Sequence, residues 1–268
     1  MLSWGRRPSI LARLRKALSR EELTARYQPI VSLEDGRWIG AEAVIAWRDA
    51  DSREVRPATL RALAEHSGLS APFSRWLLGR IAEELADLLA EERGLRIAMD
   101  LPPVALADRA VAEEFERVFE GRESALRQLA VEVEEPGLVD HAVLLTGMGA
   151  LQGIGVRVGI DAMGSGSLGP DQLHAIGPDY LNIVGNLVQA IGSGAPSEGV
   201  AEKVATLGRL LDVEVVALGV EHPSQVEYLA ERGVAAGLGW LYGKPLPADE
   251  FLTSFYDTAG AGKASAAG

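Results

Sequence analysis

The sequence contains no cysteine. Disulfide bonds, thiolate metal sites and a cysteine nucleophile are therefore excluded, and a cytoplasmic location is expected. No apolar run reaches the roughly 18 residues that span a bilayer, and no signal peptide is visible. Histidine is scarce as well, and its four copies form no pair at metal-binding spacing: His66, His141, His174 and His222. We interpret each of them as a surface or helix residue rather than a ligand.

Basic residues are outnumbered, with 26 Lys and Arg against 38 Asp and Glu, and the 268 residues carry a net charge of −12. Residues 1–20 run against this balance, since they hold six basic residues and no acid, so the remainder carries −18. An acidic body repels the phosphate backbone of nucleic acids. The charge distribution therefore predicts no nucleic acid partner.

The basic segment also has apolar residues at near-helical spacing, namely Ile10, Leu11, Leu14 and Leu18. This pattern predicts a short amphipathic helix. Two roles are open for it. Residues 1–20 could attach to a membrane surface, or they form a lead-in helix that caps the domain or joins it to another module. We favour the lead-in helix.

The remaining pattern begins with a hairpin and continues as an alternation of strands and helices. Two strand patterns, 24–33 and 36–47, flank the turn signal Glu34-Asp35-Gly36. Further strands are predicted over 95–102, 129–135, 156–163, 179–184, 213–220 and 237–243. Helices are predicted over 57–69, 71–92, 105–120, 141–155, 171–177, 197–212, 223–234 and 248–257. Each strand–helix unit takes about 25 to 35 residues.

This alternation predicts an α/β fold with a closed barrel. Several of the strands are apolar throughout, as buried parallel strands are, and the length suits a (β/α)8 barrel of TIM type. We divide the chain into the basic lead-in helix over 1–22, one barrel domain over 23–257 and a flexible tail over 258–268. The tail prediction depends on "GAGKASAAG", which has no periodicity.

Acidic residues stand at the ends of successive predicted strands. In a barrel of this kind, polar residues at the carboxyl ends of the strands face the mouth where ligands bind. Four carboxylates from four strands would form a divalent-cation site suited to phosphoryl chemistry: Glu42, Asp100, Glu132 and Asp161. Taken singly, each is better explained as a solvated loop residue, and the four in register are what favour a site. Asn182 and Glu221 follow at the ends of two later strands.

Several stretches, taken in order, resemble one family. "YQPIV" and "GAEAVIAW" resemble the opening of the EAL domain, the bacterial cyclic di-GMP phosphodiesterase domain, and the likeness continues through "LAVEVEE", "GVRVGIDAMGSG", "PDYLNIV", "VVALGVE" and "GLGWLYGKPLP". It covers about residues 11 to 257. The resemblance implies a TIM-like barrel whose first strand is antiparallel to the rest, with a dinucleotide pocket at its mouth.

The resemblance also implies roles for individual positions. The family's metal ligands fall on Glu42, Asp100 (an asparagine in the family), Glu132 and Asp161, and a further glutamate falls on Glu135. Gln28 and Pro245 match ligand-pocket positions, and Glu221 matches a loop-ordering glutamate. The Gly164-Ser165-Gly166 loop is only a weak match to a phosphate cradle.

Other family positions are replaced. The phosphate-binding arginine is Ala46, the second of two paired aspartates is Ala162, and the lysine near the attacking water is Asn182. An aspartate two residues later is Val184, the general-base glutamate is Leu218, and a pocket glutamine is Leu238. Arg48 keeps the same facing as Ala46 along a strand, so it is a candidate substitute for the missing arginine.

These replacements lead to three hypotheses. The first, which we favour here, is a catalytically inactive EAL-like regulator in cyclic di-GMP signalling that acts through contacts with an unknown protein partner. The second is a non-catalytic cyclic di-GMP receptor, and the third is an active phosphodiesterase. On the first hypothesis the chain is not an enzyme and requires no cofactor, with at most one weakly bound Mg²⁺ or Mn²⁺. A homodimer is also open, and any dimer through residues 164–177 is expected to be weak because that segment is rich in glycine.

Overall fold

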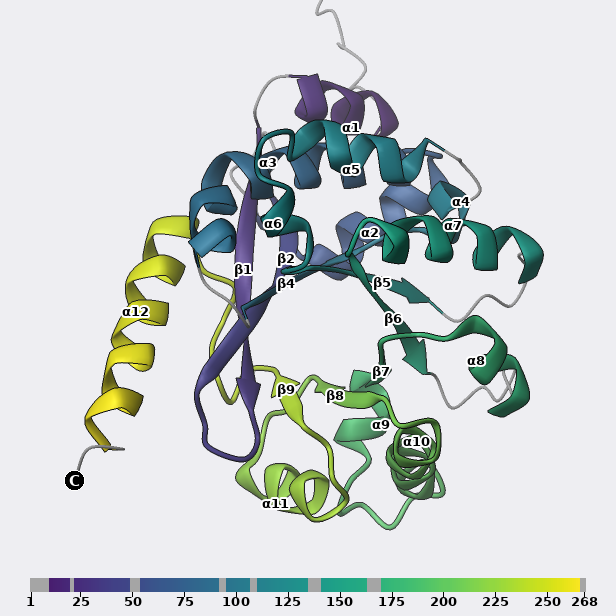
Figure 1. Ribbon diagram of the computed structural model, residues 1–268, viewed down its shortest axis with the longest axis vertical. Coiled ribbons are helices and arrows are strands. Elements are labelled where there is room, and N and C mark those ends of the chain that lie inside the picture. Colours follow the sequence, from purple (N-terminus) through teal and green to yellow (C-terminus); the bar gives the residue numbers. More distant parts are fainter. Residues whose placement is uncertain are drawn as a thin grey trace, which may run out of the picture.

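The computed structural model describes residues 10–19, 22–48, 54–91, 95–106, 110–134, 141–162 and 170–265. Eight described strands close into a barrel (Figure 1): β1 (Leu23–Ser32), β2 (Trp38–Arg48), β4 (Arg96–Asp100), β5 (Leu129–Glu134), β6 (Arg157–Ala162), β7 (Tyr180–Ile183), β8 (Glu214–Leu218) and β9 (Ala236–Leu238). The barrel strands β2 and β4 to β9 pair in parallel, whereas β1 pairs antiparallel with both β2 and β9. The short β3 (Glu54–Val55) extends the sheet at β2. The predicted barrel with an antiparallel first strand is confirmed.

Helices surround the strands, and most begin where the sequence pattern predicts them. They are α1 (Ile10–Ser19), α2 (Pro57–His66), α3 (Ser70–Glu91), α4 (Pro103–Leu106), α5 (Val111–Val118), α6 (Glu123–Leu126), α7 (His141–Gly153), α8 (Pro170–Ile176), α9 (Gly185–Gln189), α10 (Glu198–Leu211), α11 (Pro223–Glu231) and α12 (Ala248–Ser265). The short α6 and α9 were not predicted, because helices of four or five residues give no periodic signal.

Two helix predictions were wrong in extent. The single helix expected over 105–120 is interrupted, since Ala110 lies in a turn before α5 begins at Val111, and residues 107–109 lie outside the described residues. The last helix, predicted over 248–257, instead continues to Ser265, into the segment expected to be a flexible tail. Phe251 anchors α12 by stacking on Trp38 with ring centroids 5.9 Å apart, and a helix anchored in this way extends by one hydrogen bond per added residue. Residues 266–268 lie outside the described residues.

Helix α1 packs on the domain with its apolar side. Leu14 and Ala17 are fully buried in a cluster with Trp47, Leu60 and Phe73, which come from β2, α2 and α3. This packing covers Leu14 and Ala17 of α1 with protein. The choice between a lead-in helix and a membrane-surface segment stays a prediction, and residues 1–9 lie outside the described residues. No helix in the described ranges is both long and apolar enough to cross a membrane.

Small and aromatic side chains fill the inside of the barrel. Ala98, Ala130 and Ala236 lie there with Tyr180 and Leu238, all of them buried. Space for the Tyr180 ring comes from Gly159 on the neighbouring strand, where a Cβ atom would approach the ring to 2.3 Å. The barrel interior is therefore a packed core.

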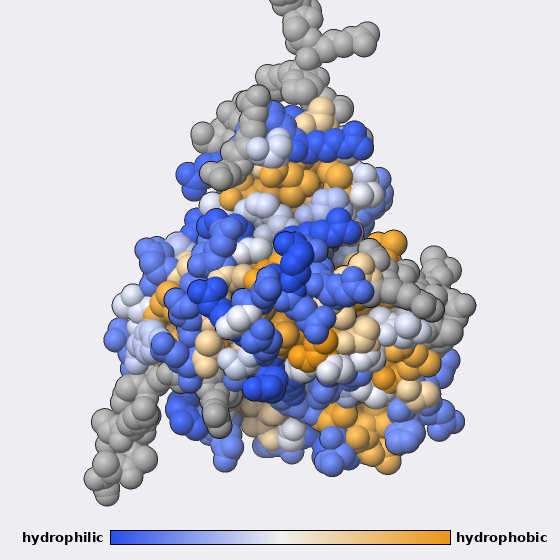
Figure 2. Space-filling view, turned by 45° about the horizontal axis from the view of Figure 1, so that its top comes forward, coloured by the Kyte–Doolittle hydropathy of each residue, from blue (hydrophilic) through white to orange (hydrophobic). Residues whose placement is uncertain are grey.

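Two arginines and a glutamate form a charged group at the Tyr180 ring. The Arg96 guanidinium lies over the Tyr180 ring, 4.8 Å from its centroid, and Arg157 lies at 5.5 Å. Both arginines donate hydrogen bonds to Glu214, at 3.1 and 2.9 Å. Elsewhere, Figure 2 shows a largely hydrophilic face with hydrophobic patches between the charged residues, as expected for this acidic chain.

Candidate functional site

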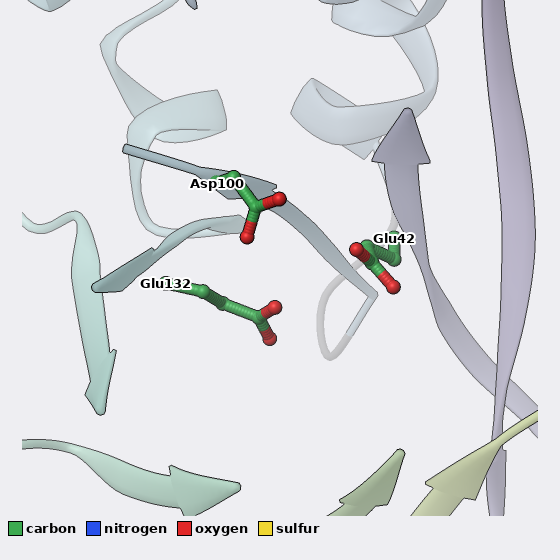
Figure 3. A group of neighbouring side chains, drawn as sticks. All are labelled: Glu42, Asp100 and Glu132. Atoms are coloured by element: carbon green, nitrogen blue, oxygen red, sulfur yellow. The ribbon is translucent and has the colours of Figure 1, made fainter. Parts of the chain in front are cut away.

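Three of the four predicted carboxylates meet at the barrel mouth. Glu42 comes from β2, Asp100 ends β4, and Glu132 lies in β5 directly beside Asp100 in the strand register. One oxygen from each carboxylate lies within 4.8 Å of the others, and Figure 3 shows the three side chains pointing toward one another. Parallel strands deliver their carboxyl ends to one edge, which is why residues far apart in sequence gather here.

These carboxylates line a cavity of about 580 Å³. Gln28 and Pro245, predicted to bind ligand, line it as well. Gln28 donates a hydrogen bond to the carbonyl of Gly243 at 3.1 Å and so joins β1 to the loop that carries Pro245. The rest of the wall is largely apolar and comes from α2 and α3, including Leu60, Phe73 and Leu77. The cavity therefore offers both an acidic end and an apolar side.

Asp161, the fourth predicted ligand, does not belong to the group of three. Its Oδ1 accepts a hydrogen bond of 2.9 Å from the side-chain amide of Asn182, and both residues are buried. Asn182 Oδ1, although fully buried, has no hydrogen-bond partner among the described residues. The amide thus holds Asp161 beside the cluster and leaves a buried acceptor that is unsatisfied without a ligand or water.

Crowding of the carboxylates changes their protonation. Burial, reinforced by Glu132, Asp100 and Asp161, raises the pKa of Glu42 well above its usual value. Burial and then Asp161 raise the pKa of Glu132 to about 8. Burial followed by Asp100 raises the pKa of Asp161 to about 6. Mutual repulsion of this kind is relieved by a cation.

Arg61 on α2 is a residue of the site that the sequence did not indicate. Its Nη1 donates to Asp100 Oδ2 at 2.9 Å, and its Nη2 lies 3.4 Å from Glu134 Oε1. Burial opposes its charge, but Asp100 and Glu134 outweigh burial and raise the pKa of Arg61. Among the described residues that line the cavity, Arg61 is the one cation. No motif signals it, because its direction depends on how α2 is rotated on the barrel.

The candidate substitute Arg48 is exposed at the end of β2 and does not line the cavity, while Ala46 is buried. Three further replaced positions carry apolar, packed side chains. Leu238 is buried inside the barrel, Leu218 packs on the same cluster, and Val184 packs on the main core. Ala162 ends β6. None of these side chains offers an oxygen to a cation or a base to a water.

Glu221 lies at the start of the loop after β8, where several hydrogen bonds meet. Its carboxylate accepts from Gln189 at 3.4 Å, and its backbone N–H donates to Gln225 at 2.8 Å. Gln225 also donates to the carbonyl of Val188 at 3.1 Å. These bonds join the loop to α9 and α11, which agrees with an ordering role. Glu135 and the Gly164-Ser165-Gly166 loop lie outside the described residues.

The donor set fits a divalent cation such as Mg²⁺ or Mn²⁺. Carboxylate oxygens are the ligands that these hard cations prefer, and three of them converge from three strands. Asn182, which hydrogen-bonds Asp161, has a fully buried Oδ1 without a hydrogen-bond partner among the described residues. Such an acceptor is available to a ligand or a water molecule. Glu42, Asp100 and Glu132 are the residues that would hold the ion.

Comparison with known proteins gives the class. The EAL domain family matches residues 11–245, and the chain belongs to this family. The chain is 28% identical over 240 residues to the "Probable cyclic di-GMP phosphodiesterase PdeB" of Escherichia coli, covering 90% of the chain and 46% of that protein. It is 30% identical to the "Cyclic di-GMP phosphodiesterase NbdA" of Pseudomonas aeruginosa, covering 92% of the chain and 32% of that protein. The chain thus spans less than half of these relatives.

Solved structures agree with the fold. "PaMucR Phosphodiesterase, c-di-GMP complex" superposes with a TM-score of 0.83 at 26% identity and covers 91% of this chain and all of that one. "EAL Enzyme Bd1971" in a form with cAMP and cyclic di-GMP superposes with a TM-score of 0.84 at 22% identity, covering 92% of this chain and 68% of that one. The TIM-like barrel is therefore established.

The expectation that the chain is not an enzyme is contradicted. Relatives that match nine-tenths of the chain are named as cyclic di-GMP phosphodiesterases, and the family is enzymatic. The error came from treating replaced residues as proof of lost activity. The expectation that no cofactor is required is likewise unsupported, since the acidic cluster can hold a metal ion.

Proposed function

We propose that this domain binds cyclic di-GMP in the mouth cavity together with a divalent cation, in the manner of a cyclic di-GMP phosphodiesterase domain. The observation that carries the proposal is the group of Glu42, Asp100 and Glu132, whose oxygens converge within 4.8 Å at the acidic end of a 580 Å³ cavity. A dianionic dinucleotide would be repelled by these carboxylates alone. A bound cation supplies the positive charge that lets a phosphate approach.

Each side chain has a distinct part in this proposal. Glu42, Asp100 and Glu132 hold the cation. Gln28 and Pro245 contact the ligand, and the apolar wall around Phe73 receives a flat base. Asn182 keeps Asp161 in place. We expect turnover to be slow, because Leu218 cannot accept a proton from the attacking water.

The test uses purified protein with Mn²⁺ and excess cyclic di-GMP. A ligand that binds only the folded state raises stability by about 2.7 kcal/mol at a hundredfold excess over Kd. We expect a rise in melting temperature that needs Mn²⁺ and disappears in Glu42→Gln. Glu65→Gln is the matched control, since Glu65 lines the cavity without joining the cluster. Chromatography of the linear dinucleotide measures hydrolysis in the same samples. If cyclic di-GMP shifts the melting temperature with neither Mn²⁺ nor Mg²⁺, the proposal is contradicted.

A second candidate is regulation through contacts with another protein. The observation in its favour is that Arg61, the lining cation, is already paired with Asp100 and Glu134, so no lining cation is free for a phosphate. Absence of any dinucleotide-dependent shift, with the fold intact, would favour this candidate.

Homodimer formation stays a prediction. Leu173, which a dimer through residues 164–177 would need at its surface, is buried in the main core, and residues 163–169 lie outside the described residues. Sedimentation at micromolar concentration measures association. A tight dimer that depends on α8 would show the expectation of a weak contact to be wrong.

A further inference from the structure

Asp100 is shared by two cation sites. It belongs to the carboxylate group that can hold a metal ion, and its Oδ2 also accepts from Arg61 Nη1 at 2.9 Å. Two cations cannot use the same carboxylate oxygen with full strength. The guanidinium of Arg61 therefore competes with a metal ion for the negative charge of Asp100.

Arg61 is well placed to change partners. Its neighbours on α2, Leu60 and Ala64, are buried in the cluster that holds α2 against β2, so the helix is fixed. The Arg61 side chain itself is 44% exposed and lines the mouth cavity. A half-exposed ion pair is worth only about 0–1 kcal/mol. Arg61 can thus leave Asp100 without moving its helix.

We propose that Arg61 is an exchangeable cation: it pairs with Asp100 in the metal-free protein and turns to a phosphate of the dinucleotide when Asp100 takes a divalent cation. Only the contact of Arg61 with a dinucleotide phosphate rests on the proposed function. Asp100 exchanges one positive partner for another, so it has a cation beside it in both states. The guanidinium released into the cavity is a planar donor that matches a phosphate group.

If Arg61 exchanges partners in this way, Arg61→Ala should change the affinities for Mn²⁺ and for cyclic di-GMP in opposite directions. Arg61→Ala removes the competitor, so Mn²⁺ should bind the free protein more tightly, by about 2- to 5-fold. At saturating Mn²⁺ the same substitution should weaken cyclic di-GMP by about 10-fold or more, because a charge-assisted contact is lost. A residue that only supports the fold would lower both affinities together.

Calorimetric titrations of Mn²⁺ and of cyclic di-GMP measure both effects, with activity playing no part. Arg61→Ala is expected to fold, since alanine favours a helix, and melting curves check this. Arg61→Lys keeps the charge but loses the planar donor, so it should compete for Asp100 and bind phosphate less well. Arg48→Ala is the charge-matched control, because Arg48 does not line the cavity.

Linkage supplies a further readout. Binding of Mn²⁺ and of cyclic di-GMP should strengthen each other by the same factor in the wild-type protein, and that factor should fall in Arg61→Ala. Failure of the wild-type protein to bind cyclic di-GMP would defeat the proposed function. Unchanged or weaker Mn²⁺ binding in Arg61→Ala would overturn the exchange itself. A dinucleotide affinity lowered by Arg48→Ala but not by Arg61→Ala would assign the phosphate contact to Arg48 instead.

Discussion

The hydroxyl group of Tyr180 donates a hydrogen bond to Oε1 of Glu132 across 3.2 Å inside the barrel. Glu132 is one of the three carboxylates of the candidate metal site, and Tyr180 is fully buried beneath it. Groups that hydrogen-bond a metal ligand fix its orientation and raise the affinity for the ion. The core of this barrel thus supports the site at its mouth.

Tyr180→Phe should therefore weaken Mn²⁺ binding by about tenfold. The phenylalanine ring fills the same space, so the cost in stability should stay near 1 kcal/mol. Calorimetric titration with Mn²⁺ measures the affinity, and urea unfolding measures stability. An unchanged Mn²⁺ affinity would mean that Tyr180 has only a packing role.

Gly159 is expected to tolerate no side chain while Tyr180 is present. A Cβ atom at residue 159 would lie 2.3 Å from the Tyr180 ring. We expect Gly159→Ala to cost about 1–3 kcal/mol by overpacking, and we expect most of this cost to vanish in a Tyr180→Ala background. Gly149→Ala, in helix α7 with open space around it, should instead stabilise the protein by about 0.5–1 kcal/mol. Urea unfolding measures the stability of Gly159→Ala, Tyr180→Ala, the double variant and Gly149→Ala. If Gly159→Ala costs the same free energy of unfolding with Tyr180 present and with Tyr180→Ala, the steric explanation is wrong.

Much of the fold was predictable because it depends on local periodicity. The strand containing Ile97, Ala98 and Met99 is apolar on both faces, which indicates burial between the barrel core and the helices. Carboxylates at strand ends were also predictable, since parallel strands align their carboxyl ends. The antiparallel first strand was not visible from periodicity, but the hairpin signal at Glu34-Asp35-Gly36 and the family resemblance both indicated it.

The details of the site were less predictable because they depend on packing between elements. Arg61 follows Leu60 on an amphipathic helix, and its direction is set by how Leu60 and Ala64 pack on β2. The separation of Asp161 from the other carboxylates depends on one amide from the next strand, Asn182. Neither arrangement has a spacing signal in the sequence.

Removing the buried side of helix α1 should destabilise the whole domain. Leu14 is fully buried against residues of β2, α2 and α3, so Leu14→Ala should cost about 2–4 kcal/mol. Arg15→Ala on the exposed side should change stability by less than about 0.5 kcal/mol. Melting curves compare the two variants. Equal, small effects on stability would mean that α1 is dispensable for the fold and would favour a role for α1 outside the domain.

Glu214 gives the fold a defined pH dependence. Burial raises its pKa, but Arg96 and Arg157 outweigh burial and hold the pKa of Glu214 below its usual value. A carboxyl group with a lowered pKa stabilises the folded state fully above its unfolded pKa of about 4.5, and this contribution is lost as the pH falls through the folded-state value. The Glu214 contribution should thus be complete at pH 7 and disappear in acid.

Glu214→Gln should therefore cost about 3 kcal/mol at pH 7, since it leaves the buried Arg96 without its carboxylate partner. The gap between variant and wild type should narrow as the pH falls from about 5 toward 3, because the wild-type carboxyl group then becomes neutral as well. Glu83→Gln, at an exposed pair with Arg80, serves as the control and should show a small difference at every pH. Urea unfolding at pH 7, 5, 4 and 3 measures the gap. A gap that stays constant into acid would show that Glu214 acts through packing and not through its charge.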